Sequence, residues 1–171
     1  MADLYLGVDP GLQGALALYY PSASEKSAVP LAMIEDMPLK DGKLDPFMLD
    51  HILARWAKLS ERHTVSAAIE RVGSRPRQAG AFNFGLSTGI VHGSLAANGF
   101  SFELVSPTEW KPAMGLTRGK LETQEENKSR ARALATQLFP NIANQFKRVR
   151  DDGRAEALLI AVYYANRRKR V

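Results

Sequence analysis

The chain has 171 residues, a formal net charge of +5 and no cysteine. A length in this range predicts a single domain spanning residues 1–171, and the lack of cysteine excludes thiol catalysis and zinc sites built on cysteine. Glycine, proline or charged residues interrupt every apolar run, so we expect a cytoplasmic protein that binds no membrane. The excess of basic residues favours a polyanionic partner, most simply nucleic acid.

The first predicted element is a hairpin of two apolar strands within residues 4–20. Pro10 and Gly11 end the first strand directly after Asp9. Because aspartate is rarely buried unless it is paired or bound to a metal, Asp9 is a candidate functional residue. The alternative is a turn aspartate that accepts hydrogen bonds from the amides following it.

A third strand, a helix and a fourth strand are predicted next. We expect them at residues 31–37, 46–60 and 64–70, with a turn at 38–44 and with Asp45 and Pro46 opening the helix. The fourth strand also ends on an acid, Glu70. A helical crossover places the carboxyl ends of parallel strands on one edge, so Asp9 and Glu70 would face each other. The alternative is an ion pair of Glu70 with Arg71 or Arg62.

The second half of the chain is predicted to be mostly helical. We expect a basic loop at 71–80, helices at 82–98 and 121–138, a strand at 100–105, a short helix from Ser106 and Pro107, a loop at 116–120 and a last helix from 151 to 170. In the helix at 82–98, Gly85, Gly89 and Gly93 recur every four positions. Such spacing allows close approach to the sheet or to another helix.

The last helix carries three acids near its start. Asp151 and Asp152 suit the positive end of the helix dipole, which is the simplest account of both. Glu156 lies one turn further in, beside an apolar run, and shares a face with Asp152 and Ile160. Two like charges on one face predict that a cationic group sits between them.

Three other motifs carry no function in our interpretation. The G-x-S-x-G pattern at 85–89 has no strand before it and no histidine after the later acids. The glycine-lysine loop at 115–120 is one residue short of a phosphate loop and has Leu121 where Ser or Thr would bind magnesium. His51, His63 and His92 lack ligand spacing.

Four acids therefore remain in an otherwise basic chain. They are Asp9, Glu70, Asp152 and Glu156. Oxygen ligands without histidine or cysteine suit Mg²⁺ or Mn²⁺, and two such ions can activate water for phosphodiester cleavage. Acids for metal within a basic frame predict a nuclease that requires no small-molecule cofactor.

Four blocks of the sequence resemble the signature of RuvC-type Holliday-junction resolvases, most closely the phage and prophage branch. The blocks are GVDPG at 7–11, AIE at 68–70, SPTEWK at 106–111 and DGRAEAL at 152–158. The resemblance implies an α/β, RNase H-like fold with a five-stranded mixed sheet in the order 3-2-1-4-5 and helices on both faces. It also implies a homodimer, with the helix at 82–98 at the interface, that makes paired nicks in four-way DNA in a bacterial or phage-infected cell.

The resemblance also suggests roles for individual residues. Lys111 and Lys128 match basic residues beside the scissile phosphate, and we include both with the four acids as catalytic. Asp151 competes with Asp152 as a metal ligand, because the spacing of Asp152 and Glu156 departs from the bacterial pattern. The aromatic wedge of the bacterial enzymes has no counterpart at 72–74. Expected DNA contacts are Arg71, Arg75, Arg77, Gln78, Lys111, Arg118, Lys120, Lys128, Lys147 and Arg148.

Two other functions stay open on the sequence. The turn at residues 9–14 could bind phosphate as in the actin and sugar-kinase superfamily, although those proteins usually need two such domains. A RuvC-like nuclease acting on structured RNA or on other branched DNA, such as replication forks, is the second alternative. Retention of the four acids argues against an inactive member.

Overall fold

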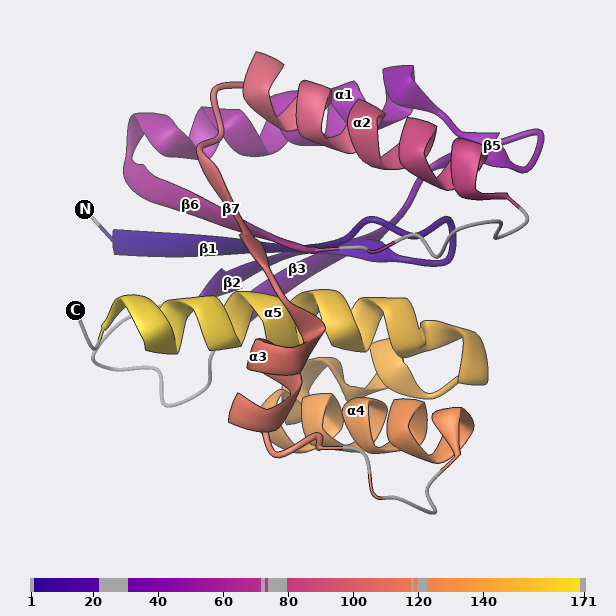
Figure 1. The fold of residues 1–171 in the computed structure, drawn as a ribbon. Coiled ribbons are helices and arrows are strands. Elements are labelled where there is room, and N and C mark those ends of the chain that lie inside the picture. The colour runs from indigo at the N-terminus through magenta and orange to yellow at the C-terminus, as the bar shows by residue number, and fades with distance from the viewer. Residues whose placement is uncertain are drawn as a thin grey trace.

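A five-stranded mixed sheet lies between two layers of helices (Figure 1). The computed structural model describes residues 2–21, 31–71, 73, 80–117, 119 and 123–169. The strands are β1 (Ala2–Asp9), β2 (Ala15–Tyr20), β3 (Leu31–Asp36), β6 (His63–Glu70) and β7 (Phe102–Val105), in the order β3-β2-β1-β6-β7. Strands β1, β2 and β3 are antiparallel, whereas β6 and β7 continue the sheet in parallel. The predicted order 3-2-1-4-5, counted along this sheet, is confirmed.

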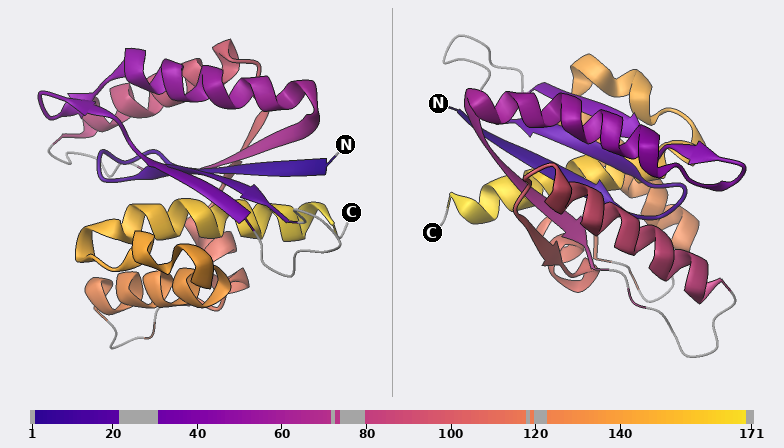
Figure 2. Two further views of the ribbon diagram at one scale, coloured as in Figure 1. Left: turned by 180° about the vertical axis from the view of Figure 1, so that it is seen from behind. Right: turned by 90° about the horizontal axis from the view of Figure 1, so that it is seen from above.

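The helices divide between the two faces of the sheet. Helices α1 (Pro46–Ala57) and α2 (Ala81–Ala97) lie side by side on one face, and α5 (Asp152–Arg168) runs along the other (Figures 1 and 2). Helices α3 (Pro107–Ala113) and α4 (Gln124–Leu138) lie against α5. The remaining elements are a hairpin of β4 (Leu39–Lys40) and β5 (Lys43–Leu44) and three short 3₁₀ segments, η1 (Lys58–Glu61), η2 (Pro140–Phe146) and η3 (Val149–Asp151).

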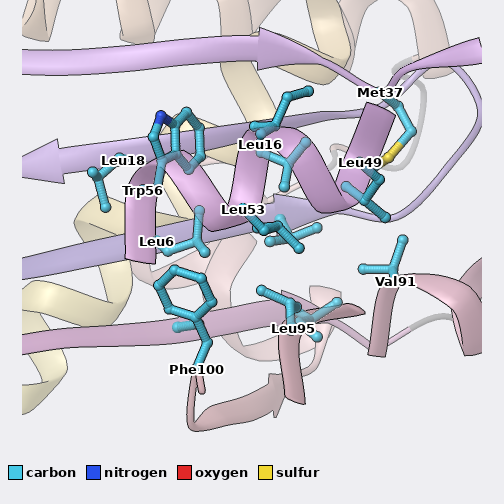
Figure 3. Packing of buried hydrophobic residues seen from close by; sticks show 14 of the residues in the cluster. Leu6, Leu16, Leu18, Met37, Leu49, Leu53, Trp56, Val91, Leu95 and Phe100 are labelled. Atoms are coloured by element: carbon cyan, nitrogen blue, oxygen red, sulfur yellow. The ribbon is translucent and has the colours of Figure 1, made fainter. Parts of the chain in front are cut away.

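Apolar side chains fill the space between the sheet and each helical layer. On the α1 and α2 face, Trp56 and Leu53 of α1 pack with Leu6 of β1 and with Leu95 of α2 (Figure 3). On the opposite face, a second cluster joins β1, β7 and α3 to α5, and a third joins β2 and α4 to α5. Helix α5 is therefore buried along most of its length, which explains its unbroken apolar run.

The backbone of α5 approaches β1 so closely that only glycine fits at the crossing point. A Cβ atom on Gly7 would lie 2.1 Å from the carbonyl oxygen of Ala157 and 2.5 Å from the amide nitrogen of Ala161. Real Cβ atoms do not make contacts below 3.0 Å. Gly7 thus fixes the distance between the strand that ends at Asp9 and the helix that carries Glu156.

Capping residues account for the starts of several helices. Asp45 caps α1 by accepting hydrogen bonds from the amides of Phe47 and Met48. Capping boxes start α3 at Ser106 and α4 at Thr123. No helix in the described part of the chain is long and apolar enough to cross a membrane.

Some predicted boundaries were wrong. The segment at 38–44 forms the β4–β5 hairpin rather than a simple turn, because Asp41 and Gly42 both adopt positive φ, as two-residue hairpin turns require. The first helix becomes 3₁₀ after Ala57, the fifth sheet strand starts at Phe102, and η2 was not predicted. Helix α4 begins at Gln124, and residues 121 and 122 lie outside the described part.

Candidate active site

Asp9 and Glu70 lie at the carboxyl ends of neighbouring parallel strands. The register pairs Val8 of β1 with Ile69 of β6, so the two acids follow side by side at the same edge of the sheet. Asp9 Oδ1 also accepts a hydrogen bond of 3.1 Å from the amide of Gly11, which is the turn interaction considered as the alternative. Both roles are compatible, because this bond occupies one oxygen only.

Glu70 does not form the surface ion pair considered for it. Among the described residues, neither Arg71 nor Arg62 pairs with its carboxylate. The Arg71 amide instead donates to the carbonyl of Val105, 2.7 Å away, which extends the pairing of β6 with β7 past Glu70. Glu70 therefore points its charge at the candidate site rather than at a basic neighbour in the sequence.

The remaining acids come from the first turns of α5, which packs directly on the β1–β2 turn. At Gly153, an added Cβ would lie 2.1 Å from the carbonyl oxygen of Gln13, so again only glycine fits. This contact holds Asp152 and Glu156 beside the strand ends. Glu156 is 9% exposed although it is charged.

Two lysines from the neighbouring helices pair with the acids of α5. Lys111 Nζ of α3 lies 2.9 Å from Glu156 Oε1, and Lys128 of α4 pairs with Asp152. Interaction with Asp152 is the main cause of the raised pKa of Lys128, and Glu156 and Asp9 contribute. The cationic group that the sequence predicts between Asp152 and Glu156 is thus supplied by two side chains.

Burial, together with neighbouring negative charge, raises the pKa of both strand-end acids. The pKa of Asp9 rises to about 6, first because of burial and then because of Glu156, while the Gly11 amide opposes the shift. The pKa of Glu70 rises to about 8 because of burial, Glu156 and Asp9, against the opposing effects of Lys111 and Trp110. Three carboxylates from three elements therefore share one electrostatic environment.

Glu70 and Glu156 open onto a cleft of about 700 Å³ between the sheet edge, α3 and α4. Its lining comprises Glu70, Pro107, Thr108, Lys111, Pro112, Leu116, Thr117, Asn127, Lys128 and Glu156. The amide of Asn127 donates to the carbonyl of Leu116, 3.3 Å away, and so joins α4 to the segment after α3. Both lysines reach the acids from this side.

Asp151 does not join the other acids. It is 1% exposed and accepts hydrogen bonds from the backbone amide of Arg148 at 2.7 Å and from its guanidinium at 2.9 Å. Burial alone would raise the pKa of Asp151, but these hydrogen bonds outweigh it and lower the pKa. Asp151 has a structural partner, so Asp152 is the better candidate for a metal ligand.

The carboxylate oxygens are suitable ligands for a divalent metal ion, but the side chains are not arranged around one in the structure. Within the described ranges, no three His, Cys, Asp or Glu side chains stand ready to hold a metal ion. Two of the four acids are engaged by lysines instead. Oxygen donors that repel one another are nevertheless what Mg²⁺ or Mn²⁺ would neutralise. The residues fit such an ion if the lysines release the acids.

Two of the predicted DNA contacts that the structure describes line this cleft. Lys111 and Lys128 line it, Arg71 directly follows Glu70 and is exposed, and Lys147 is exposed on a separate segment. Arg148 is engaged by Asp151. The other predicted contacts, Arg75, Arg77, Gln78, Arg118 and Lys120, lie outside the described residues.

Some site features escaped the sequence reasoning. Arg132 and Arg150 line a second groove of about 510 Å³ that shares Lys128 with the first cleft, but charge patterning alone could not place them there. Trp110 interacts with both Glu70 and Lys111. Its position within the SPTEWK block was the sequence signal that could have identified it. Gly153 belongs to the DGRAEAL block, yet its role depends on a contact between segments that are distant in the sequence.

A sheet in this order with helices on both faces has the RNase H-like fold. Among solved structures with this fold, two of RuvC from Thermus thermophilus are similar. The complex with a Holliday junction substrate has a TM-score of 0.59 and 20% identity, covering 95% of this chain and 92% of that chain. A second RuvC structure has a TM-score of 0.56 with the same identity and coverage.

These likenesses confirm the fold that the resemblance to RuvC implied. No family model matches the chain, and no curated protein matches its sequence. The phage or prophage branch stays a prediction, as do the roles of the individual site residues.

Proposed function

We propose that this protein is a divalent-metal-dependent endonuclease that cuts four-way or related branched DNA. The observation that carries the proposal is the single cluster formed by Asp9, Glu70 and Glu156, to which two lysines are joined. Burial and the charge of neighbouring carboxylates both raise the pKa of Asp9 and of Glu70, so placing these acids beside Glu156 does not stabilise the free protein. A polyanionic substrate with bound cations would relieve that repulsion.

The two lysines handle the phosphate backbone in this proposal. Lys111 and Lys128 approach from α3 and α4 on one side of the cleft, and each ammonium group carries three donors. If cations replaced the lysines at the acids, the ammonium groups of Lys111 and Lys128 would be free to donate to non-bridging oxygens of the scissile phosphate. Contacts of this kind orient the backbone without reading the base sequence.

Asp9, Glu70, Asp152 and Glu156 are the residues that would hold the ions. Mg²⁺ or Mn²⁺, as two ions in our prediction, would supply activation of the attacking water and stabilisation of the leaving oxygen. The protein's own part is to hold these carboxylates close together, at the strand ends and on the first turns of α5. Burial and the neighbouring acids raise the pKa of Glu70 to about 8, so an added positive charge would favour its ionised form at neutral pH.

Support for branched DNA as substrate comes from the fold. The similar RuvC structure is in complex with a Holliday junction substrate, and this chain covers 92% of it. The net charge of +5 is consistent with a polyanion. The test is cleavage of an immobile four-way junction, a replication fork, a linear duplex and a structured RNA, each with Mg²⁺ and with chelator.

Selective, metal-dependent nicking of the junction at opposed strands would support the proposal. Cleavage of the RNA alone would overturn the choice of DNA, and cleavage unaffected by chelator would overturn the metal. Asp152→Asn provides the catalytic control, and Asp151→Asn provides a matched control at the neighbouring carboxylate that we do not assign to the site.

Paired nicks call for two active sites, and we include a homodimer in the proposal. Helix α2 turns Val91 and Leu95 toward its own core, whereas its glycines point away from the sheet. A Cβ added at Gly85, Gly89 or Gly93 would meet no atom within 4 Å. The glycines therefore do not serve packing within the subunit, which was the alternative explanation for their spacing.

The exposed face of α2 also carries large apolar side chains. Phe82 is 81% exposed and Leu86 is 54% exposed. A second copy related by a two-fold axis would cover both through the same helix. Light scattering after size exclusion should give about twice 18.8 kDa for the wild type and for Leu138→Glu, and about 18.8 kDa for Leu86→Glu. A protein mass of 18.8 kDa for the wild type, both alone and as the protein part of its complex with junction DNA, would contradict the dimer.

A further inference from the structure

Trp110 occupies a position that is determined by the strand carrying Val105. Val105 ends β7 in register with Glu70, and the capping box at Ser106 starts α3 directly afterwards. Trp110 therefore stands one turn into a helix whose start is fixed beside Glu70. Its side chain is 0% exposed and packs with apolar residues of β7 and α5.

The indole N–H of Trp110 has no complete hydrogen bond. Nε1 is buried without a partner among the described residues. It nevertheless interacts with the carboxylate of Glu70 and opposes the rise of its pKa. A buried donor left unpaired destabilises a protein by about 1–3 kcal/mol, and buried tryptophan usually satisfies its N–H. The carboxylate of Glu70, an acid of the candidate site, is therefore a candidate acceptor for this donor.

The ring of Trp110 meets a second site residue. Lys111 Nζ lies 5.1 Å from the ring centroid, within the range of a cation–π interaction. The same ammonium group lies 2.9 Å from Glu156. One buried side chain is therefore in contact with a lysine on its face and interacts with an acid through its edge.

We propose that Trp110 is a positioning residue, which donates its indole N–H to Glu70 when that carboxylate turns into the site and supports Lys111 on its ring. The inference rests on the proposed function, because it gives Glu70 a metal-binding orientation.

The first test observes the indole proton in the wild-type protein. The chain contains two tryptophans, so a ¹⁵N-tryptophan sample gives two indole signals that Trp56→Phe assigns. Adding Mg²⁺ should move the Trp110 indole proton downfield, because a stronger hydrogen bond deshields it. The Trp56 signal should stay, because Trp56 lies in the core on the opposite face of the sheet.

The second test measures metal affinity with matched variants. Trp110→Phe removes the N–H and keeps a ring under Lys111, whereas Trp56→Phe makes the same change at another buried tryptophan, which is 2% exposed. Free Mn²⁺ measured by electron paramagnetic resonance should show about tenfold weaker binding by Trp110→Phe, as for the loss of a group that orients a ligand. Trp56→Phe should bind as the wild type does.

The outcomes separate this inference from the function on which it rests. If Mg²⁺ moves the backbone signals of Asp9 and Glu156 but leaves the Trp110 indole unchanged, the positioning role is overturned and the metal site stands. Equal Mn²⁺ affinity of Trp110→Phe and Trp56→Phe has the same meaning. A wild-type protein whose spectrum does not respond to Mg²⁺ overturns both. The indole measurement needs no folded Trp110 variant.

Discussion

Replacing Gly153 by alanine tests the contact that brings the acids of α5 to the strand ends. An alanine Cβ there would lie 2.1 Å from the carbonyl oxygen of Gln13 and 2.8 Å from the Cα of Gly14. Both atoms belong to the backbone of the β1–β2 turn and cannot rotate away. The substitution must therefore push the start of α5 away from the turn that follows Asp9.

The size of the displacement follows from the distances. Cβ contacts below 3.0 Å essentially do not occur, so the two segments must separate by at least 3.0 − 2.1 = 0.9 Å. Overpacking of this kind destabilises by about 1–3 kcal/mol, whereas glycine to alanine within a helix stabilises by about 1 kcal/mol. We expect a net loss of about 1 kcal/mol in the free energy of unfolding. Cleavage should fall about 100-fold, since displacements near 1 Å have that effect on aligned groups.

Urea unfolding and single-turnover cleavage of a four-way junction at saturating Mg²⁺ measure the two effects. Gly73→Ala is the control for stability, because an added Cβ there meets no atom within 4 Å. The reasoning is refuted if Gly153→Ala is at least as stable as the wild type and cleaves at the wild-type rate. Loss of stability with unchanged cleavage would refute the role of this contact in aligning the acids.

Three further predictions concern charge. Asp9→Asn should abolish junction cleavage and leave binding in gel shift intact, because it removes a ligand and reduces repulsion of phosphate; cleavage at the wild-type rate would contradict the site. The pKa of Glu70 is about 8 when folded and 4.5 ordinarily, so the folded protein keeps a proton that the unfolded chain releases. The resulting contribution to stability is complete below pH 4.5 and is lost as the pH rises toward 8. Melting temperatures measured in chelator should therefore fall across this window for the wild type, and the profile should be flatter for Glu70→Gln. Equal profiles for the two proteins would refute the raised pKa of Glu70. Lys111→Met and Lys128→Met should each reduce the slope of log affinity against log salt by about 0.9, and an unchanged slope would exclude the phosphate contact.

Local patterns in the sequence were sufficient for the sheet and for the candidate acids. Asp9 and Glu70 each end an apolar strand, and the helix between the strands dictates parallel pairing, so their proximity followed from topology. Glu156 was recognisable because a charge interrupts an apolar helix face. These signals depend on residues close in sequence, which is why they could be interpreted without the structure.

Features that depend on contacts between distant segments could not be predicted in the same way. The sequence left the choice between Asp151 and Asp152 open, because it could not show that Arg148 pairs with Asp151. The glycines of α2 were compatible with packing on their own sheet, and only the three-dimensional arrangement shows that they face outward. Gly153 matters because of the turn at Gln13, more than a hundred positions away in sequence.

The charges of the candidate site argue that metal and DNA binding depend on each other. Four carboxylates and two lysines, Lys111 and Lys128, leave a charge of −2 when all six groups are ionised. The protein relieves part of this repulsion by retaining protons, as the raised pKa values of Asp9 and Glu70 indicate. A phosphate would approach such a centre more favourably with cations bound than without them. Because binding couplings are reciprocal, DNA should then raise the affinity for divalent ions by the same factor by which the ions raise the affinity for DNA. Lys111 and Lys128 pair with the acids of α5 in the structure, and we propose that they become available to the DNA backbone only when metal takes their place.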